Sequence, residues 1–241
     1  MTDIKKHLEE LKKAAEEGDP EAQSQWGLLL ATGDHVPQDT EEALSWLRRA
    51  AQLGEITAMC NLGIILENGL GCEPDLDEAA LWYWQAAELG DTQAKMKLGT
   101  MVLKGLGFIP GSPAVKAIEA SAERGDPYAQ SFYAKLHLDG IGVEPNSETA
   151  EKWFRFAAAQ GDESAIFNLG EMMANAMTVL TPEEELSQWF FDLGMKYLQT
   201  ADLVKAFDCL VCIKRIDPAS FLTQRLEDDI ERANQQHRPG E

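Results

Sequence analysis

Glycine recurs in this chain at an almost constant interval, and this interval constrains the fold more than any other feature of the sequence. The recurring positions lie 36, 36, 35 and 36 residues apart, at Gly18, Gly54, Gly90, Gly125 and Gly161. A fixed period of about 20 to 50 residues is typical of stacked structural repeats, in which each unit contacts only its neighbours. The sequence therefore predicts a repeat protein.

Two helical patterns fill each period. The first carries a small residue and then Leu-Gly or an equivalent pair, as at Ala58 and Leu62-Gly63. The second carries an aromatic residue eight positions before the boundary, at Trp46, Trp82, Trp153 and Trp189. Interlocking layers need large side chains that face small ones, so we interpret these tryptophans as packing residues rather than as a cofactor site.

A glycine-containing loop separates the two helical patterns, as in the stretch NGLGCEPD that begins at Asn68. A phosphate-binding loop would occur once, after a strand, whereas this loop recurs between helices. Its glycines allow positive φ, and Asp39, Asp75 or Asn146 follows where a helix N-cap belongs. The Gly-Asp pairs at the period boundaries have the same capping chemistry. We therefore expect the loop to turn the chain and not to bind a ligand.

The combination of an A-x-x-x-L-G first helix, a G-x-G-V-like loop and an A-x-x-W-x-x-x-A-A second helix resembles the Sel1-like repeat (SLR) family. That family is an α/α solenoid related to tetratricopeptide repeats, so the resemblance implies an all-α, right-handed superhelix of helical hairpins. It also implies protein–protein scaffolding rather than catalysis. The resemblance covers about residues 18–197 and implies five repeats, at 18–53, 54–89, 90–124, 125–160 and 161–197.

Segments outside the five repeats are predicted to cap the stack, whose end units would otherwise leave an apolar face in water. Residues 1–17 have the second-helix pattern, with Glu10 in place of the tryptophan. Residues 187–241 are predicted to form a tetratricopeptide-like hairpin and a C-terminal capping helix, continuous with the solenoid. In that pattern the helix around Trp189 is the first of its pair, whereas in the repeat register it is the second, and the sequence leaves both open.

Two repeats depart from the pattern. The third is one residue short and has Ala117 where the tryptophan belongs. Its second helix should therefore pack more loosely, which would allow a hinge near residues 105–120. The fifth has NAMTVLTPEEE in place of the glycine loop, and this change should alter the angle between its helices.

Charge narrows the class of partner. The chain has 41 acidic and 21 basic residues and a net charge of −20, which disfavours binding to nucleic-acid phosphates or to an anionic membrane. No stretch approaches the roughly 18 uninterrupted apolar residues of a membrane span, and the N-terminus lacks the pattern of a secretory signal. We expect a cytoplasmic protein whose partner is a protein or peptide, with acidic ends that would attract a basic one. The oligomeric state stays open.

No set of catalytic or metal-binding residues can be named. The histidines are scattered, with no HExxH pair and none beside a candidate nucleophile: His7, His35, His137 and His237. Cys209 and Cys212 form a C-x-x-C without the second pair of ligands that a zinc site needs, and they lie inside a helical pattern rather than at a helix N-terminus. With Cys60 and Cys72, they are interpreted as free thiols. We expect no catalytic residue, metal or cofactor.

A binding surface is expected on the first helices, which line the concave side of a right-handed stack of hairpins. Residues three before and one after the Leu-Gly glycine should face this groove. The first row is Ser24, Cys60, Met96, Ser131 and Phe167, and the second row is Leu28, Ile64, Thr100, Lys135 and Glu171. These positions vary while the structural positions repeat, as on a binding surface carried by a fixed scaffold. The alternative is that some of them are half-buried between hairpins.

Three functions are compatible with these features. The leading hypothesis is a non-enzymatic scaffold or adaptor that binds a protein segment in the groove. An alternative, motivated by the charge of −20, is an acidic inhibitor or immunity-type protein that covers a basic toxin or nuclease. From a different class, a thiol- or zinc-dependent regulator or enzyme accessory would use Cys60 or the Cys209/Cys212 pair.

Overall fold

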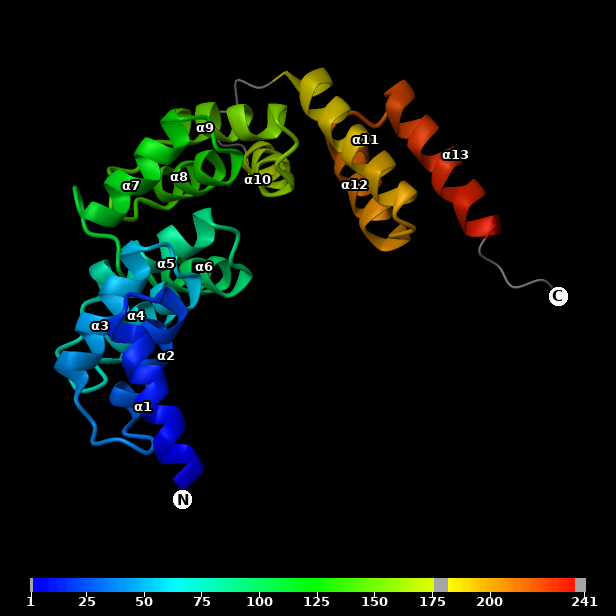
Figure 1. The fold of residues 1–241 in the computed structure, drawn as a ribbon. Helices are drawn as coiled ribbons and strands as arrows, with labels where there is room; N and C mark the ends of the chain where they lie inside the picture. The colour runs from blue at the N-terminus through cyan, green and yellow to red at the C-terminus, as the bar shows by residue number, and fades with distance from the viewer. Residues whose placement is uncertain (1, 176–181, 237–241) are drawn as a thin grey trace. The chain divides into compact units, whose positions relative to one another are not determined.

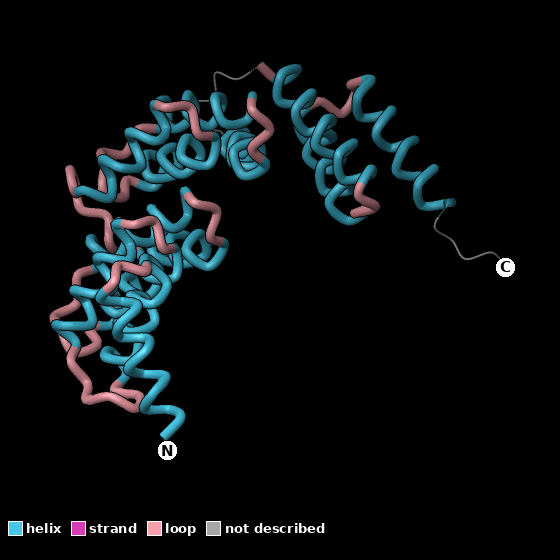
Figure 2. The backbone as a smooth tube through the Cα atoms, viewed as in Figure 1, coloured by secondary structure: helices cyan, strands magenta, loops and turns pink. Residues whose placement is uncertain are grey.

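The computed structural model describes residues 2–175 and 182–236, and within these ranges it contains thirteen α-helices and no strand (Figure 1). Successive helices are joined by short turns and pack as hairpins, so the predicted all-α solenoid of helical hairpins is confirmed (Figure 2). The chain divides into two compact units. Unit 1 comprises Met1–Ala117 with Ile141–Val143, and unit 2 comprises Ile118–Gly140 with Glu144–Glu241.

Unit 1 contains two regular hairpins. Helix α2 packs mainly against α3, and α4 mainly against α5, while α1 packs on α2, α3 on α4 and α5 on α6. From α1 to α6, successive helices thus contact each other, as stacked repeats require. The helices are α1 (Thr2–Glu16), α2 (Pro20–Thr32), α3 (Thr40–Gln52), α4 (Ile56–Asn68), α5 (Leu76–Glu88), α6 (Thr92–Lys104) and the first part of α7 (Pro113–Glu123).

Unit 2 begins within α7. In it, α8 forms a hairpin with α9, α10 packs on α9, and α13 packs on both α11 and α12. The helices are α8 (Pro127–Asp139), α9 (Ser147–Ala159), α10 (Glu163–Ala174), α11 (Glu183–Gln199), α12 (Leu203–Ile216) and α13 (Phe221–Gln236).

Helix ends follow the predicted capping chemistry. At the first boundary Gly18 has a φ of 99°, and the Asp19 carboxylate accepts a 2.7 Å hydrogen bond from the backbone N–H of Ala22. The same bond recurs at the starts of α6, α8 and α10. In the inner loop of the second repeat, Gly69 and Gly71 have φ values of 63° and 76°, and Asp75 caps α5. The loop therefore turns the chain, as its sequence predicts.

Small residues in the first helices let the second helices approach closely. A Cβ at Gly27 would lie 2.8 Å from Leu47 Cγ, and one at Gly63 would lie 2.5 Å from Tyr83 Cε1. Of the four repeated tryptophans only Trp46 is buried; the other three are partly buried against neighbouring helices. The predicted packing role holds, but these rings lie at the edge of the core.

Helix α11 satisfies both registers that the sequence left open. Phe190 packs against Gly170 of α10, at the place where a second helix packs in the earlier hairpins. The Leu-Gly pair of the same helix ends in Gly194, which faces Leu226 of α13 and Cys209 of α12 as a first helix would. Because α11 has 17 residues instead of 13, it can serve as the second helix of one pair and the first of the next.

The positions of the irregular segments of the sequence can be compared with the structure. The change from unit 1 to unit 2 falls at Ala117, inside the range where a hinge is expected. The predicted repeat end at residue 197 lies within α11, and the chain turns after it, where Ala201 has a φ of 59° and Asp202 caps α12. Residues 176–181, which belong to the stretch NAMTVLTPEEE, and His237 lie outside the described residues.

Candidate functional site

The first predicted row is largely structural. Ser24 and Ser131 are buried, with 2% and 5% exposure. Ser131 is hydrogen-bonded to Asp162, which caps the next first helix, and the Cys60 thiol donates to Asp91 of the equivalent cap over 3.6 Å. At these positions the alternative interpretation, burial between adjacent hairpins, is the observed one.

The environment of Cys60 also limits its chemistry. Burial raises the pKa of this thiol to about 11, and the charge of Asp91 and its hydrogen bond act in the same direction. Because the thiolate is the nucleophile and the metal ligand, Cys60 is held in its unreactive form near neutral pH.

Unit 1 presents apolar side chains on three successive first helices. Leu28 of α2, Ile64 of α4 and Met96 of α6 are 42%, 38% and 62% exposed, and Thr100 of α6 is exposed beside Met96. We call these four residues the unit 1 face. It mixes one first-row residue with three from the second row, which therefore contributes most of the accessible positions in this unit.

A cavity of about 290 Å³ lies beside the unit 1 face. Ile64 and Cys60 of α4 line it together with Gln93 and Lys97 of α6. The Lys97 ammonium is held by Glu67 at 2.8 Å, and the same carboxylate oxygen accepts a 2.9 Å hydrogen bond from the Tyr83 hydroxyl. Beside the cavity, Glu67 of α4 thus links its helix to α5 and to α6.

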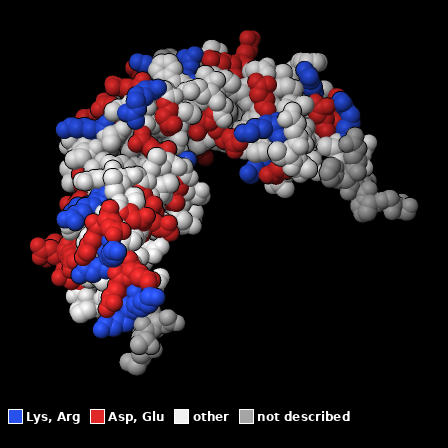
Figure 3. Space-filling view, viewed as in Figure 1, with Lys and Arg blue, Asp and Glu red and all other residues white. Residues whose placement is uncertain are grey.

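Charge is unevenly divided between the helices of unit 1. The first helices α2, α4 and α6 carry only Glu21 and Glu67 as acids, whereas the second helices α3 and α5 carry five: Glu41, Glu42, Asp77, Glu78 and Glu88. Figure 3 shows acidic and basic side chains mixed on the visible face of both units. The strong net charge is therefore not concentrated on the unit 1 face.

In unit 2 the predicted positions split again. Lys135 forms an ion pair with Asp139 at 3.3 Å on its own helix. Phe167 and Glu171 of α10 line a cavity of about 490 Å³, whose other wall is formed by Cys212 and Ile216 of α12. Phe167 and Glu171 thus line an accessible cavity. This cavity also involves α12, which is not one of the helices expected to line the groove.

The outward side of α12 is the part of the surface that the sequence interpretation missed. Val204, Phe207 and Val211 are exposed there. They are apolar residues beyond those that α12 buries in the core, which include Ala206, Leu210 and Ile213. The sequence did contain a sign of this surface, because α12 has more apolar residues than its packing in the repeat needs.

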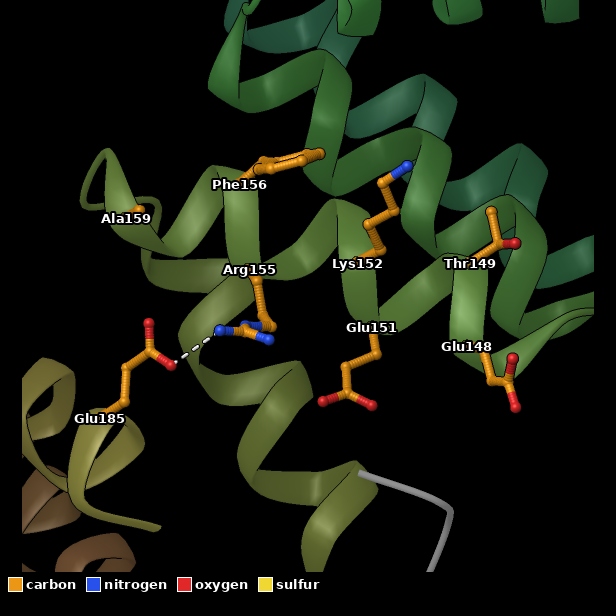
Figure 4. Close-up of a pocket in the computed structure, with 8 residues that line it drawn as sticks. All are labelled: Glu148, Thr149, Glu151, Lys152, Arg155, Phe156, Ala159 and Glu185. Carbon is orange, nitrogen blue, oxygen red and sulfur yellow. Dashed lines mark hydrogen bonds and ion pairs between the residues drawn. The ribbon is translucent and has the colours of Figure 1, made fainter. Parts of the chain in front are cut away.

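A cavity of about 650 Å³ lies between α9 and the start of α11 (Figure 4). The Arg155 guanidinium crosses it to the Glu185 carboxylate at 2.9 Å. In unit 1, Arg48 of α3 bonds to Glu78 of α5 at 3.0 Å in the equivalent place. Since the ion pair recurs between successive second helices, we interpret it as a structural link rather than as part of a ligand site.

The C-x-x-C pair is not arranged for thiol or metal chemistry. Cys209 is fully buried, and burial raises its pKa to about 12; burial also raises the pKa of Cys212. Among the described residues no group of three His, Cys, Asp or Glu side chains could hold a metal ion. The same part of the chain contains no helix of the length and apolar character needed to span a membrane.

Comparison with known families agrees with the hairpins and caps described above. The Sel1 repeat model matches residues 20–55, 56–91 and 127–162. These spans contain the pairs α2–α3, α4–α5 and α8–α9, which correspond to the first, second and fourth predicted repeats. The chain thus contains three Sel1 repeats, and the Sel1 repeat family generally consists of protein–protein interaction scaffolds.

Two solved structures are similar. One is a Sel1 repeat protein from Oxalobacter formigenes, 26% identical, with 80% of this chain and 87% of that one covered and a TM-score of 0.43. The other is a protective antigen of uropathogenic Escherichia coli with an SLR fold, 24% identical, with 95% and 56% covered and a TM-score of 0.43. This chain thus spans little more than half the length of the antigen. A search of curated proteins gave no match.

Proposed function

We propose that this protein is a non-enzymatic scaffold that binds a segment of another protein on the unit 1 face. The observation that carries the proposal is the exposure of Leu28, Ile64 and Met96 on three successive first helices, beside a cavity. At the position of Met96, two other repeats have the buried serines Ser24 and Ser131, and Ser131 is hydrogen-bonded to the cap of the next hairpin. The exposed residues are therefore not required by the repeat itself.

The physical basis is burial of apolar surface by a partner. Covering an aliphatic side chain contributes roughly 1.5–3 kcal/mol when the burial is complete, so three such side chains are enough to anchor a short segment. The few acids on the first helices suit an apolar segment, and the acidic second helix α5 would speed the approach of a partner with basic residues. The proposal includes a cytoplasmic location and capping roles for residues 1–17 and 187–241.

The test compares substitutions on and off the unit 1 face. The tagged protein is used to capture partners from its native cell, and each captured protein is then purified and its affinity measured. Met96→Glu and Ile64→Glu should abolish binding. Leu89→Glu is the matched control, because Leu89 is 53% exposed but follows the second helix α5. Retained binding by Met96→Glu at unchanged helicity would contradict the proposal.

The affinity measurement, repeated at several salt concentrations, distinguishes the scaffold from the alternative of an acidic inhibitor. An inhibitor that covers a basic toxin or nuclease would lose affinity steeply as salt rises, because screening weakens exposed charge pairs. A partner held mainly by Leu28, Ile64 and Met96 should show little salt dependence.

A further inference from the structure

A second accessible apolar surface lies in unit 2, on α12. Val204, Phe207 and Val211 are 74%, 54% and 41% exposed, and their i, i+3, i+7 spacing places them along one stripe of the helix. The opposite side of α12 is already committed to the core through Ala206, Cys209, Leu210 and Ile213. The exposed stripe is therefore not needed to pack this helix.

The stripe leads to the cavity between α10 and α12. Arg215 follows Val211 by four residues, so it lies on the same side of the helix, and it also lines the cavity. Apolar side chains form most of the cavity wall: Phe167 and Met173 from α10, and Cys212 and Ile216 from α12. A side chain that enters this cavity would be in contact with four apolar residues from two helices.

Glu171 and Arg215 line the cavity, and Asp208 lies one helical turn before Cys212, which also lines it. After burial, the causes that shift the pKa of Cys212 are Arg215, which lowers it, and Asp208 and Glu171, which raise it. Within the described part of the chain none of these three charges forms an ion pair or a hydrogen bond, whereas Lys205 and Lys214 of the same helix pair with Asp202 and Glu227. The rim thus offers two acids and one arginine to a partner.

We propose that the stripe of Val204, Phe207 and Val211, together with the adjoining cavity, binds a basic amphipathic helix of a partner protein. We call this surface the α12 face. Apolar anchors repeated at i, i+3, i+4 and i+7 are the pattern by which helices dock against such surfaces. Lysine or arginine residues on the docked helix pair with Asp208 and Glu171, and one acid pairs with Arg215.

Charge excludes the competing occupants. A second copy of the chain and an acidic helix both bring more negative charge to a protein that already carries −20, and this repulsion opposes their binding. The inference rests on the proposed role in protein binding, but it assigns a surface separate from the unit 1 face.

The probe is a fluorescein-labelled, helix-forming peptide of about 18 residues, with leucines at i, i+4, i+7 and i+11 and lysines beside them. Its twin has glutamate in place of every lysine. Fluorescence anisotropy with the full chain should show binding of the lysine peptide alone. Val211→Glu should weaken that binding by roughly tenfold or more. Equal binding of the twin, or no effect of Val211→Glu, would overturn the proposal.

Two double variants distinguish the effect of the charges near the cavity from the effect of the protein's net charge. Glu171→Lys combined with Asp208→Lys should weaken binding of the lysine peptide and strengthen binding of the glutamate peptide. Glu144→Lys with Glu148→Lys makes the same change in net charge at two other exposed positions of unit 2. This second pair should have a much smaller effect, and equal effects of the two pairs would show that only diffuse charge attracts the peptide.

Two further measurements distinguish this inference from the proposed function. Met96→Glu, on the unit 1 face, should leave peptide binding unchanged. If it abolishes binding, the peptide sits on the unit 1 face, and the α12 proposal fails while the proposed function stands. Sedimentation should show no self-association through the α12 face. Self-association that Val211→Glu removes would mean that a second copy of the chain occupies this face.

Discussion

The hairpin of α4 and α5 and the helix that follows it, α6, carry the same Leu-Gly pair but differ in how the glycine is used. At Gly63 an added Cβ would lie 2.5 Å from the ring of Tyr83, so the helices meet at a distance that only glycine allows. At Gly99 an added Cβ would meet no atom within 4 Å. The motif thus supplies a small residue, while the side chain opposite decides whether close packing follows.

A polar link strengthens the first of these two regions. The Glu67 carboxylate of α4 accepts hydrogen bonds from the Tyr83 hydroxyl of α5 and the Lys97 ammonium of α6, at 2.9 and 2.8 Å. Burial alone would raise the pKa of Glu67, but these two bonds and the charges of Lys97 and Lys104 together outweigh it, and the pKa is lowered. Tyr83 therefore contributes both to apolar packing and to the charged state of its neighbour.

The largest effect is expected from removal of the ring that covers Gly63. Tyr83→Ala should lower the free energy of unfolding by about 3–5 kcal/mol, as is usual for a buried aromatic residue, because Tyr83 is only 1% exposed. Tyr83→Phe removes only the hydroxyl and should cost about 1 kcal/mol. Urea denaturation measures both, and similar losses for the two variants would show that ring packing contributes little.

Addition of one carbon at the close contact should cost less. Gly63→Ala should lower the free energy of unfolding by about 1–3 kcal/mol through overpacking. The cost should disappear when the same substitution is made in a Tyr83→Ala background, because the clashing ring is then absent. A cost that persists in the double variant would place the clash elsewhere.

The polar link gives a pH-dependent effect of intermediate size. Since the folded-state pKa of Glu67 is lowered, its contribution is present above the unfolded-state value of about 4.3 and is lost as pH falls through the folded value. Glu67→Gln should therefore flatten the loss of stability below about pH 5, with a cost of roughly 1–2 kcal/mol at pH 7. Unfolding curves measured from pH 3 to 7 check this, and an unchanged slope would contradict it.

The smallest effect, and the only stabilising one, is expected at the open glycine. Gly99→Ala should raise the free energy of unfolding by about 0.5–1 kcal/mol, because alanine is the better helix former and its Cβ meets nothing. Thermal and urea unfolding of this variant, run beside Gly63→Ala, would complete the comparison. A loss of stability at Gly99 would mean that the space is filled in solution.

Much of the candidate site could not be predicted from the sequence. The rule that selected two rows of first-helix residues placed Ser131 and Met96 in the same row, yet the first is buried against a cap and the second is 62% exposed. The α12 face was missed because its cavity is formed with α10, which lies about 40 residues earlier in the chain. Exposure depends on atoms that other helices bring, and no local pattern reports it.

The sequence by itself determined the features that depend on a few neighbouring residues. Positive φ at the boundary and loop glycines, and the aspartate caps that follow them, are properties of short backbone segments, so their spacing was enough to predict hairpins with a period of 36. Only the tertiary structure decided that Gly63 is packed and Gly99 is open, and that α11 serves two hairpins at once. These outcomes depend on the volume and position of side chains on other helices, and close packing is a property of the assembled layers rather than of any one of them.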